Sequence, residues 1–200
     1  MSLVINNCSY EAARYAVLHW HYSQAMPVGK LIKYGTWENG VFIGAVLFGR
    51  GVNRNIGKPY KLGQHEVCEL VRVALTRHDC QVTKIISQCI SLIKKNNPRL
   101  RLIVSYADSS QDHTGIIYQA GNWIYTSGST EPNLFLNGKQ VHGRSVGAKY
   151  GTRSLSWLKD NVDKSARYEE GLPKYKYLYP LDKKMRKQIM PLSKQYPKAV

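Results

Sequence analysis

The chain has few cysteines, few acidic residues and no long apolar segment. Its cysteines show no CxxC spacing, so the sequence indicates neither a zinc knuckle nor a disulfide framework; they are Cys8, Cys68, Cys80 and Cys89. No apolar run approaches the roughly 20 residues that a membrane helix needs, and the N-terminus has no basic-then-apolar signal pattern. We therefore expect a cytoplasmic protein without a membrane partner, whose cysteines are reduced and pack, in three cases, as small hydrophobic side chains.

The scarcity of acidic residues gives the chain a strong positive charge. Its 200 residues include 29 Lys and Arg against 13 Asp and Glu, for a net charge of +16 and a pI near 9.8. A field of this sign attracts polyanions, and nucleic acid is the partner that we expect. An acidic membrane surface is the weaker alternative, because the sequence has no amphipathic anchor and no lipidation motif.

The positive charge is concentrated toward the C-terminus. Residues 1–148 carry 16 basic and 8 acidic groups and residues 149–200 carry 13 and 5, so each part has a net charge of +8 although the second is far shorter. The second part interleaves its cations with Tyr150, Tyr168, Tyr175, Tyr177, Tyr179 and Tyr196. Because cations suit phosphates and rings suit bases, we predict a folded domain over residues 1–148 and a basic, tyrosine-rich extension over 149–200 that contacts nucleic acid. A solubilising, partly ordered extension is the alternative.

Length and hydrophobic periodicity indicate one α/β or α+β domain with a mixed sheet. Apolar alternation and turn signals predict strands near residues 3–6, 31–37, 41–48, 67–75, 102–108, 123–125 and 134–139. Helical spacing predicts helices over residues 10–20, with Ser9 as N-cap, over 83–95, and briefly around Tyr118. The Glu-Asn-Gly at residues 38–40 predicts a hairpin, and the segment 50–63, rich in Gly, Asn and Lys, predicts a loop that is mobile or contacts a ligand.

The most informative segment runs from residue 102 to residue 123. An apolar strand ends on Asp108, a polar turn follows, and a short helix then carries Tyr118. Open α/β sheets place their ligand chemistry at the carboxyl ends of strands. A carboxylate and a phenol there predict a site, with Asp108 as a base or a carboxylate ligand and Tyr118 as a general acid. The alternative is an Asp that caps a helix and a Tyr that packs in the core.

Three further residues are candidates for the same site. His21 follows the first helix and could act as a general base or metal ligand, because the imidazole pKa is about 6.5. Tyr22 could donate a proton or bind a metal as phenolate. Arg72 lies in an otherwise apolar strand, where a guanidinium needs an anionic partner, either Asp108 or a ligand phosphate. Packing is the alternative for His21 and Tyr22, and an ion pair with Glu69 is the alternative for Arg72.

Three short blocks make the chain resemble a known family. They are His21-Tyr-Ser after the first helix, Glu69-Leu-Val-Arg in the central strand, and Ser105-Tyr-Ala-Asp followed by Thr114-Gly-Ile-Ile-Tyr-Gln-Ala-Gly-Asn-Trp. Together, over residues 9 to 128, they resemble the GNAT acyltransferase superfamily and, within it, the Mom-like DNA-modification proteins of bacteriophages. The third block is the most specific of the three, and the other two are suggestive.

The resemblance implies a fold, an activity and a set of site residues. It implies a single GNAT-like catalytic domain that converts the exocyclic amine of adenine in double-stranded DNA to a methylcarbamoyl (acetamido-type) derivative, which shields phage DNA from restriction. It implies acetyl-CoA binding and a bound iron, in the cytoplasm of the bacterial host. The catalytic residues would be His21, Tyr22, Arg72, Asp108 and Tyr118, and the iron ligands His21, Tyr22 and Asp108. The oligomeric state stays open, a homodimer included.

One turn departs from the superfamily's pattern. GNAT enzymes usually hold the CoA pyrophosphate in a Gly-rich turn between the central strand and the next helix, but here residues 75–84 contain no glycine. A helix N-terminus still offers free N–H groups, and cations lie near it. The expected cofactor contacts are therefore Arg77, Gln81, Thr83 and Lys84, with Ser109 after the next strand, although backbone approach is poorer without glycine.

Two other classes of function stay open. The chain could be a conventional N-acetyltransferase for an amine of a protein or small molecule, although a charge of +16 is unnecessary for small substrates. It could also be a non-catalytic DNA-binding protein on a decayed fold, although Asp108 and Tyr118 are both intact. A modifying enzyme must reach an amine inside the duplex stack, by flipping the base or by using unpaired DNA. The rings that could stack on such a base are Trp20, Tyr22, Tyr106 and Trp123.

Overall fold

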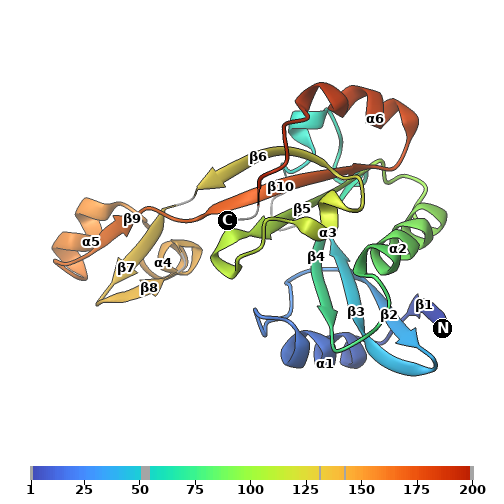
Figure 1. Ribbon diagram of the computed structural model, residues 1–200. Helices are drawn as coiled ribbons and strands as arrows, with labels where there is room; N and C mark the ends of the chain where they lie inside the picture. The colour runs from blue at the N-terminus through green and yellow to red at the C-terminus, as the bar shows by residue number, and fades with distance from the viewer. Residues whose placement is uncertain (1, 51–54, 131, 142, 199–200) are drawn as a thin grey trace.

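A seven-stranded mixed sheet forms the centre of the molecule (Figure 1). The computed structural model describes residues 2–50, 55–130, 132–141 and 143–198. The strand order is β1-β2-β3-β4-β5-β10-β6, and neighbouring strands are antiparallel except for the pair β4 and β5. The mixed α/β fold predicted from the sequence is therefore confirmed.

The N-terminal part of the chain supplies three strands and one helix. These are β1 (Leu3–Asn7), α1 (Tyr10–Trp20), β2 (Leu31–Glu38) and β3 (Val41–Gly49). α1 begins after Ser9, whose hydroxyl accepts a hydrogen bond from the amide of Ala12 at 3.1 Å, as the sequence predicts. β2 and β3 join through Asn39 and Gly40, whose φ angles of 50° and 82° suit a two-residue hairpin turn.

The middle of the chain builds a strand–helix–strand unit and the elements that follow it. These are η1 (Lys58–Tyr60), β4 (Val67–Leu75), α2 (Val82–Asn96), β5 (Leu102–Asp108), η2 (Ser109–Gln111), α3 (Ile116–Gln119) and β6 (Ile124–Thr130), where η denotes a 3₁₀ helix. The parallel pairing of β4 with β5 ends at Leu70 and Ser105, although both strands continue. A bulge in β4 places Val71 outside the register with β3 at this level. The two strands therefore separate toward their carboxyl ends.

Helices cover both faces of the sheet. α2 packs on one face through five buried residues at helical spacing, Ile85, Ile86, Cys89, Ile90 and Ile93. α1 packs on the other face, against Ala45 and Leu47 of β3, while the alternating residues Val46 and Phe48 join the core on the α2 side. The sheet is thus buried on both faces around β3, β4 and β5.

Residues 133–169 form a separate small unit, here called the insert subdomain. Its elements are β7 (Asn133–Leu136), β8 (Lys139–Val141), α4 (Gly143–Tyr150), α5 (Leu155–Asn161) and β9 (Arg167–Glu169). Its own core buries Leu134, Leu136, Val146, Leu158 and Ala166, and the unit projects from the end of β6 (Figure 1). The strand predicted near residues 134–139 does exist, but it was wrongly assigned to the central sheet, because β7 pairs with β8 and β9 instead.

The sequence predicts a domain boundary at residue 148, but the main core continues past that residue. β10 (Pro173–Pro180) lies inside the central sheet, paired with β5 on one side and β6 on the other. α6 (Lys183–Ile189) and η3 (Met190–Leu192) follow, and Met185 and Ile189 of α6 are buried against Leu102 and Val104 of β5. The C-terminal residues are therefore part of the main core, and the insert subdomain interrupts that core between β6 and β10.

The segment predicted as a loop, residues 50–63, is packed where the structure describes it. Residues 51–54 lie outside the described residues. From residue 55 on, Ile56, Tyr60 and Leu62 are buried in the same cluster as α6. Lys58 and Lys61 remain exposed, so this part of the segment is anchored and presents cations.

The cysteines lie mostly in the interior of the protein. All four cysteines are free, and Cys68, Cys80 and Cys89 are buried, which confirms the prediction that three of them pack as hydrophobic side chains. Among the described residues, no helix has both the length and the apolarity to cross a membrane.

Candidate active site

The separation of β4 from β5 opens a pocket of about 450 Å³. Its walls come from the end of α1, from residues 70–73 of β4, from residues 106–108 of β5, and from the segment 111–118 that follows. The five residues predicted as catalytic all line this pocket: His21, Tyr22, Arg72, Asp108 and Tyr118. The fold thus brings side chains from three distant stretches of sequence to one place, and their chemical roles remain a proposal.

Arg72 is held by carbonyl oxygens. Its guanidinium is half-buried and donates to the carbonyl of Val71 at 2.7 Å and, through Nε and Nη2, to the carbonyl of Ala25 at 3.3 Å. Within the part of the chain that the structure describes, no ion pair joins Arg72 to Asp108 or to Glu69, so of the anionic partners considered from the sequence a ligand phosphate is the one that stays a prediction. A cation that is fixed by carbonyls and faces the pocket keeps its charge available for an anionic or developing-anionic ligand.

Asp108 both lines the pocket and caps the next turn. Its Oδ1 accepts hydrogen bonds from the amide of Ser110 at 3.1 Å and from the hydroxyl of Ser110 at 2.7 Å. The capping role considered as the alternative is therefore real. The two roles are compatible, because a carboxylate has two oxygens and the cap uses only one of them.

Tyr118 is buried beside Ser105, and burial raises its pKa to about 12. The Ser105 hydroxyl lies 2.9 Å from the carbonyl of Leu70 and 2.8 Å from the Tyr118 hydroxyl. Ser105 has one proton and a carbonyl can only accept, so Ser105 donates to Leu70 and Tyr118 donates to Ser105. Tyr118 is thus a neutral phenol at pH 7, with an oriented proton and an acceptor oxygen in the wall of the pocket.

His21 has a defined tautomer. The amide of Ser23 donates to His21 Nδ1 at 3.1 Å, and the Ser23 hydroxyl lies 2.8 Å from the same nitrogen. A backbone N–H can only donate, so Nδ1 is an acceptor and the neutral ring carries its proton on Nε2. His21 is therefore suited to donating a hydrogen bond through Nε2, which differs from the general-base role that the sequence suggested.

We expect His21 to titrate far below an ordinary histidine. Burial, then Arg72 and then His113 lower its pKa from 6.5 to about 4. The unfolded chain binds this proton more tightly than the folded chain does. The lowered pKa of His21 therefore decreases the free energy of unfolding as the pH falls from 6.5 toward 4, and it has no effect above pH 6.5. A two-dimensional NMR titration of the histidine rings should show a midpoint near pH 4 for His21. A midpoint near 6.5 would contradict the buried, cation-facing environment.

Tyr22 covers the mouth of the pocket. Its ring is tilted against His21 with centroids 4.3 Å apart and meets His113 edge-on at 5.7 Å, while half of its surface (52%) is exposed. Burial of the other half and the nearby Asp108 raise the pKa of its phenol. The hydroxyl is therefore protonated at neutral pH, and the exposed face of the ring is free to meet a planar ligand.

The predicted iron ligands do not fit a metal centre. No group of three or more His, Cys, Asp or Glu side chains arranged to hold a metal occurs among the described residues. His21 keeps its proton on Nε2 and its Nδ1 is engaged by Ser23, while the raised pKa of Tyr22 disfavours a phenolate. Because this donor set is unsuited to iron, no chemical step is assigned to a metal.

The predicted cofactor contacts lie outside the pocket. Arg77, Gln81 and Lys84 are exposed around the turn before α2, Thr83 is half-buried there, and the hydroxyl of Ser109 donates to the carbonyl of Pro173. The fold does bring these residues near the amino end of α2, apart from Ser109. Their role in cofactor binding stays a prediction.

A carboxylate already occupies two amides of that turn. The buried Glu38, at the end of β2, accepts from the amide of Asp79 at 2.9 Å and from that of Cys80 at 2.8 Å. A hydrogen bond with the Cys80 thiol, followed by those from the amides of Asp79 and Cys80, lowers the pKa of Glu38. The amides of Asp79 and Cys80 are therefore not available to a pyrophosphate at this turn.

Sequence reasoning misplaced one ring and missed two polar residues. Trp123 is only 1% exposed and packs against Tyr118 at 5.0 Å, so it belongs to the core and not to the pocket. Ser105 and His113 were not singled out as site residues. A serine inside an otherwise apolar strand was the available signal for Ser105, whereas His113 lies in a polar turn that gives no such contrast.

The chain matches one family over almost its whole length. Residues 2–198 match the sequence model of the Mom protein family. The chain belongs to this family. A curated Mom relative, methylcarbamoylase mom of Escherichia phage Mu, is 25% identical over 195 residues, which are 94% of this chain and 79% of that protein. The Mom resemblance inferred from the three sequence blocks is confirmed.

Solved acetyltransferases share the fold of this Mom family member. An N-acetyltransferase from Staphylococcus aureus Mu50 superposes with a TM-score of 0.52 at 12% identity, covering 91% of this chain and all of that one. The yncA protein of Salmonella typhimurium, solved with its cofactor acetyl-CoA, gives 0.51 at 14% identity, over 92% and 96% of the two chains. At this identity the likeness establishes the fold, which is that of GNAT acetyltransferases.

Proposed function

We propose that the chain is a Mom-type transferase that modifies adenine in DNA. It would convert the exocyclic amine to a methylcarbamoyl (acetamido) derivative with a group derived from acetyl-CoA, and so protect phage DNA from restriction. The observation that carries the proposal is the pocket at the separated strands, where His21, Tyr22, Arg72, Asp108 and Tyr118 meet in a chain of the Mom family. The phage Mu relative is named for methylcarbamoylation.

Asp108 is the residue best placed to take a proton. The amine of adenine is a weak nucleophile because its lone pair is delocalised into the ring. An acceptor that removes an N–H proton as the new N–C bond forms lowers that barrier. The carboxylate oxygen of Asp108 that does not cap η2 fits this role, and the proton would pass from the amine nitrogen to that oxygen.

Two donors surround the same space. The guanidinium of Arg72 and the Nε2–H of His21 belong to side chains that line the pocket, whereas the single proton of Tyr118 is donated to Ser105, so its hydroxyl offers an acceptor oxygen. Donors fixed before the reaction stabilise negative charge on a carbonyl oxygen as a bond forms to its carbon. Acetyl-CoA, when bound between β4 and β5, would present its thioester carbonyl to these donors, and attack of the amine at that carbon would release the CoA thiol and give N-acetyl adenine. The acetamido product instead joins the amine nitrogen to a methylene carbon and carries one more nitrogen, so it requires a nitrogen donor besides acetyl-CoA, and no transfer step is assigned.

The substrate amine must also leave the base stack. Trp20, Tyr22 and Tyr106 line the pocket, and the last two expose 52% and 38% of their surface. Aromatic rings at the entrance of a pocket offer stacking to a flipped or unpaired base. These three rings replace the set predicted from the sequence, from which Trp123 is removed.

The direct test is the composition of DNA from cells that express the protein. Mass spectrometry of enzymatically released nucleosides should show a modified deoxyadenosine heavier by the mass of the acetamido group, absent from cells with an empty vector. A product with the mass of N-acetyl-deoxyadenosine would replace the proposed chemistry by ordinary acetyl transfer. Unmodified adenosine with acetylated protein or polyamines would favour a conventional N-acetyltransferase.

A further inference from the structure

The insert subdomain carries more exposed cations than its own structure uses. Residues 133–169 include seven Lys and Arg against three Asp and Glu. Two of the carboxylates are engaged inside the unit: Asp163 accepts from the amides of Asn137 at 2.6 Å and Ser165 at 2.8 Å, and Glu169 pairs with Arg167. The remaining exposed lysines, Lys139, Lys149, Lys159 and Lys164, give the subdomain a positive surface.

Aromatic rings are exposed among these cations. Trp157 and Tyr168 are each 39% exposed. The ring of Tyr150 lies 6.1 Å from that of Trp157, and Nζ of Lys149 lies 5.0 Å over the Tyr150 ring. The hydroxyl of Tyr168 donates to the carbonyl of Arg153 at 3.2 Å, which connects β9 to the segment between α4 and α5. These five residues are called the aromatic–basic patch.

The subdomain is attached at the end of the sheet that holds the pocket. Thr130 of β6 pairs with Pro173 of β10, so the chain leaves the sheet and returns to it at one point. At that point Lys174 pairs with Asp108, and the hydroxyl of Ser109 donates to the carbonyl of Pro173. The point where the subdomain joins the sheet is therefore beside the carboxylate proposed as base, and a ligand that extends from the subdomain onto the sheet reaches the pocket there.

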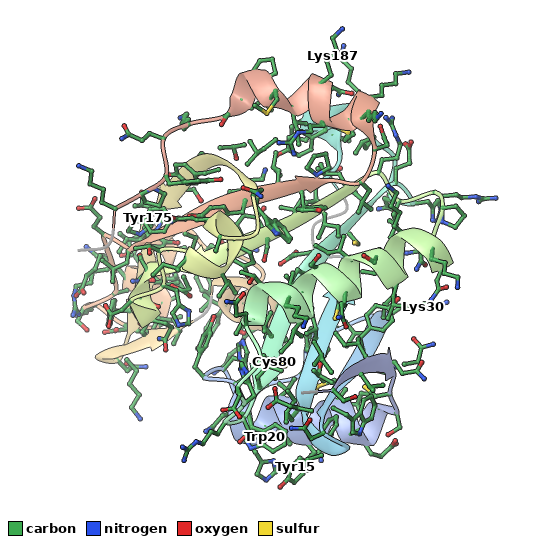
Figure 2. The ribbon with its side chains drawn as sticks, turned by 45° about the vertical axis from the view of Figure 1, so that its right-hand side comes forward. Tyr15, Trp20, Lys30, Cys80, Tyr175 and Lys187 are labelled. Atoms are coloured by element: carbon green, nitrogen blue, oxygen red, sulfur yellow. The ribbon has the colours of Figure 1, made fainter. Side chains whose placement is uncertain are left out.

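A second cationic surface lies at the other end of the sheet. α6 exposes Lys183, Lys184, Arg186 and Lys187. β10 runs away from Asp108 and ends at Pro180, opposite Leu102, which at 3.3 Å per residue is roughly 20 Å from Lys174. Lys187 on α6 and Trp20 of the pocket lie at opposite edges of the molecule (Figure 2). Both surfaces are positively charged, so charge alone does not distinguish them. They differ in position, because the insert subdomain joins the sheet beside the pocket and α6 lies at the opposite end of β10.

We propose that the insert subdomain, and not α6, is the surface that holds duplex DNA over the pocket. Its exposed lysines would contact phosphates, which supply most of the affinity and all of its salt dependence. Trp157 and Tyr168 would stack on bases exposed where the duplex opens beside the pocket. The inference rests on the proposed function only for the identity of the polyanion as DNA.

Two charge-matched triple variants of the full chain test this assignment. One changes Lys149, Lys159 and Lys164 to Gln, and the other changes Lys183, Lys184 and Lys187 to Gln, so both lose three positive charges from exposed sites. Binding of a fluorescently labelled duplex is measured by anisotropy across a salt series. We expect the subdomain variant to lose at least tenfold in affinity and about 0.9 from the salt slope for each phosphate contact removed. The α6 variant should stay within about threefold of the wild type.

Equal losses in the two triple variants would overturn the proposal, because the charge would then act only through the whole-molecule field. A larger loss in the α6 variant would move the DNA to the opposite end of the sheet. Trp157→Ala supplies a second readout that involves no charge: affinity for unpaired DNA should fall about tenfold with an unchanged salt slope, and an unchanged affinity would remove the stacking role.

The failure of this inference and that of the proposed function can be told apart. If the wild type leaves adenine unmodified but only the subdomain variant loses DNA affinity, DNA binding by the insert subdomain is supported and adenine modification is rejected. If the wild type modifies adenine but both triple variants bind DNA equally well, adenine modification is supported and DNA binding by the insert subdomain is rejected. Thermal unfolding of each triple variant, expected to match the wild type because the changed lysines are exposed, excludes a folding defect as the cause.

Discussion

Asp108→Asn should lower the rate of adenine modification by about 10²- to 10⁴-fold, the usual contribution of a positioned proton acceptor. The substitution keeps an oxygen that can accept from the amide and hydroxyl of Ser110, so the cap of η2 is retained. It removes only the negative charge that the proposed reaction needs. The rate is measured as modified deoxyadenosine formed on plasmid DNA, by mass spectrometry.

The matched control for Asp108→Asn is its DNA affinity. The variant should bind a duplex as tightly as the wild type, because Asp108 lies in the pocket and not on the basic surface. A wild-type rate would show that Asp108 serves only as a cap. A loss of folding, measured by circular dichroism, would mean that the charge itself is structural.

Trp123→Ala should cost about 3–5 kcal/mol of the free energy of unfolding, as expected for truncating a buried aromatic ring. The ring is 1% exposed and packs against Tyr118 at 5.0 Å and Tyr179 at 5.3 Å, which leaves a large cavity when it is removed. Urea denaturation followed by fluorescence or circular dichroism measures the change. At temperatures where the variant is folded, its DNA affinity should equal that of the wild type.

Trp157→Ala is the matched control for that loss. Trp157 is 39% exposed on α5 and lies beside the Tyr150 ring, so its removal should cost about 1 kcal/mol of the free energy of unfolding, well below the loss expected for Trp123. The pair separates two uses of the same residue type, since one tryptophan supports the core and the other is proposed to meet DNA. A small effect of Trp123→Ala on stability, or a large effect of Trp157→Ala, would reverse this assignment.

Local pattern was sufficient for three of the elements that form the core. The Ser9 cap, the Asn39-Gly40 turn and the helical spacing of Ile85, Ile86 and Ile93 each act over a few residues, so sequence alone predicts α1, the β2–β3 hairpin and α2. The convergence of the five pocket residues also followed from short blocks. It required the family resemblance as well, because spacing along the chain does not bring His21 next to Asp108.

The pairing of strands that are far apart in the sequence could not be predicted from local pattern. The segment Pro173-Lys-Tyr-Lys-Tyr-Leu-Tyr-Pro reads as a basic tail by charge, yet it alternates as a strand, and Tyr177 is fully buried. Only its two neighbours, β5 and β6, reveal that it is an interior strand. The hydrogen bonds of Glu38 could not be predicted for the same reason, since its partners Asp79 and Cys80 are about 40 residues away along the chain.

The interior position of β10 has a consequence for how the protein matures. Until residues 173–180 are synthesised, β5 and β6 each lack a neighbour, and their unpaired edges are exposed to association with other chains. The closing step pairs Asp108 with Lys174 across the whole insert subdomain, and contacts of such sequence separation form slowly. A chain that ends soon after Tyr118 would hold every residue of the pocket yet lack β10, so we expect it to be inactive and prone to aggregate.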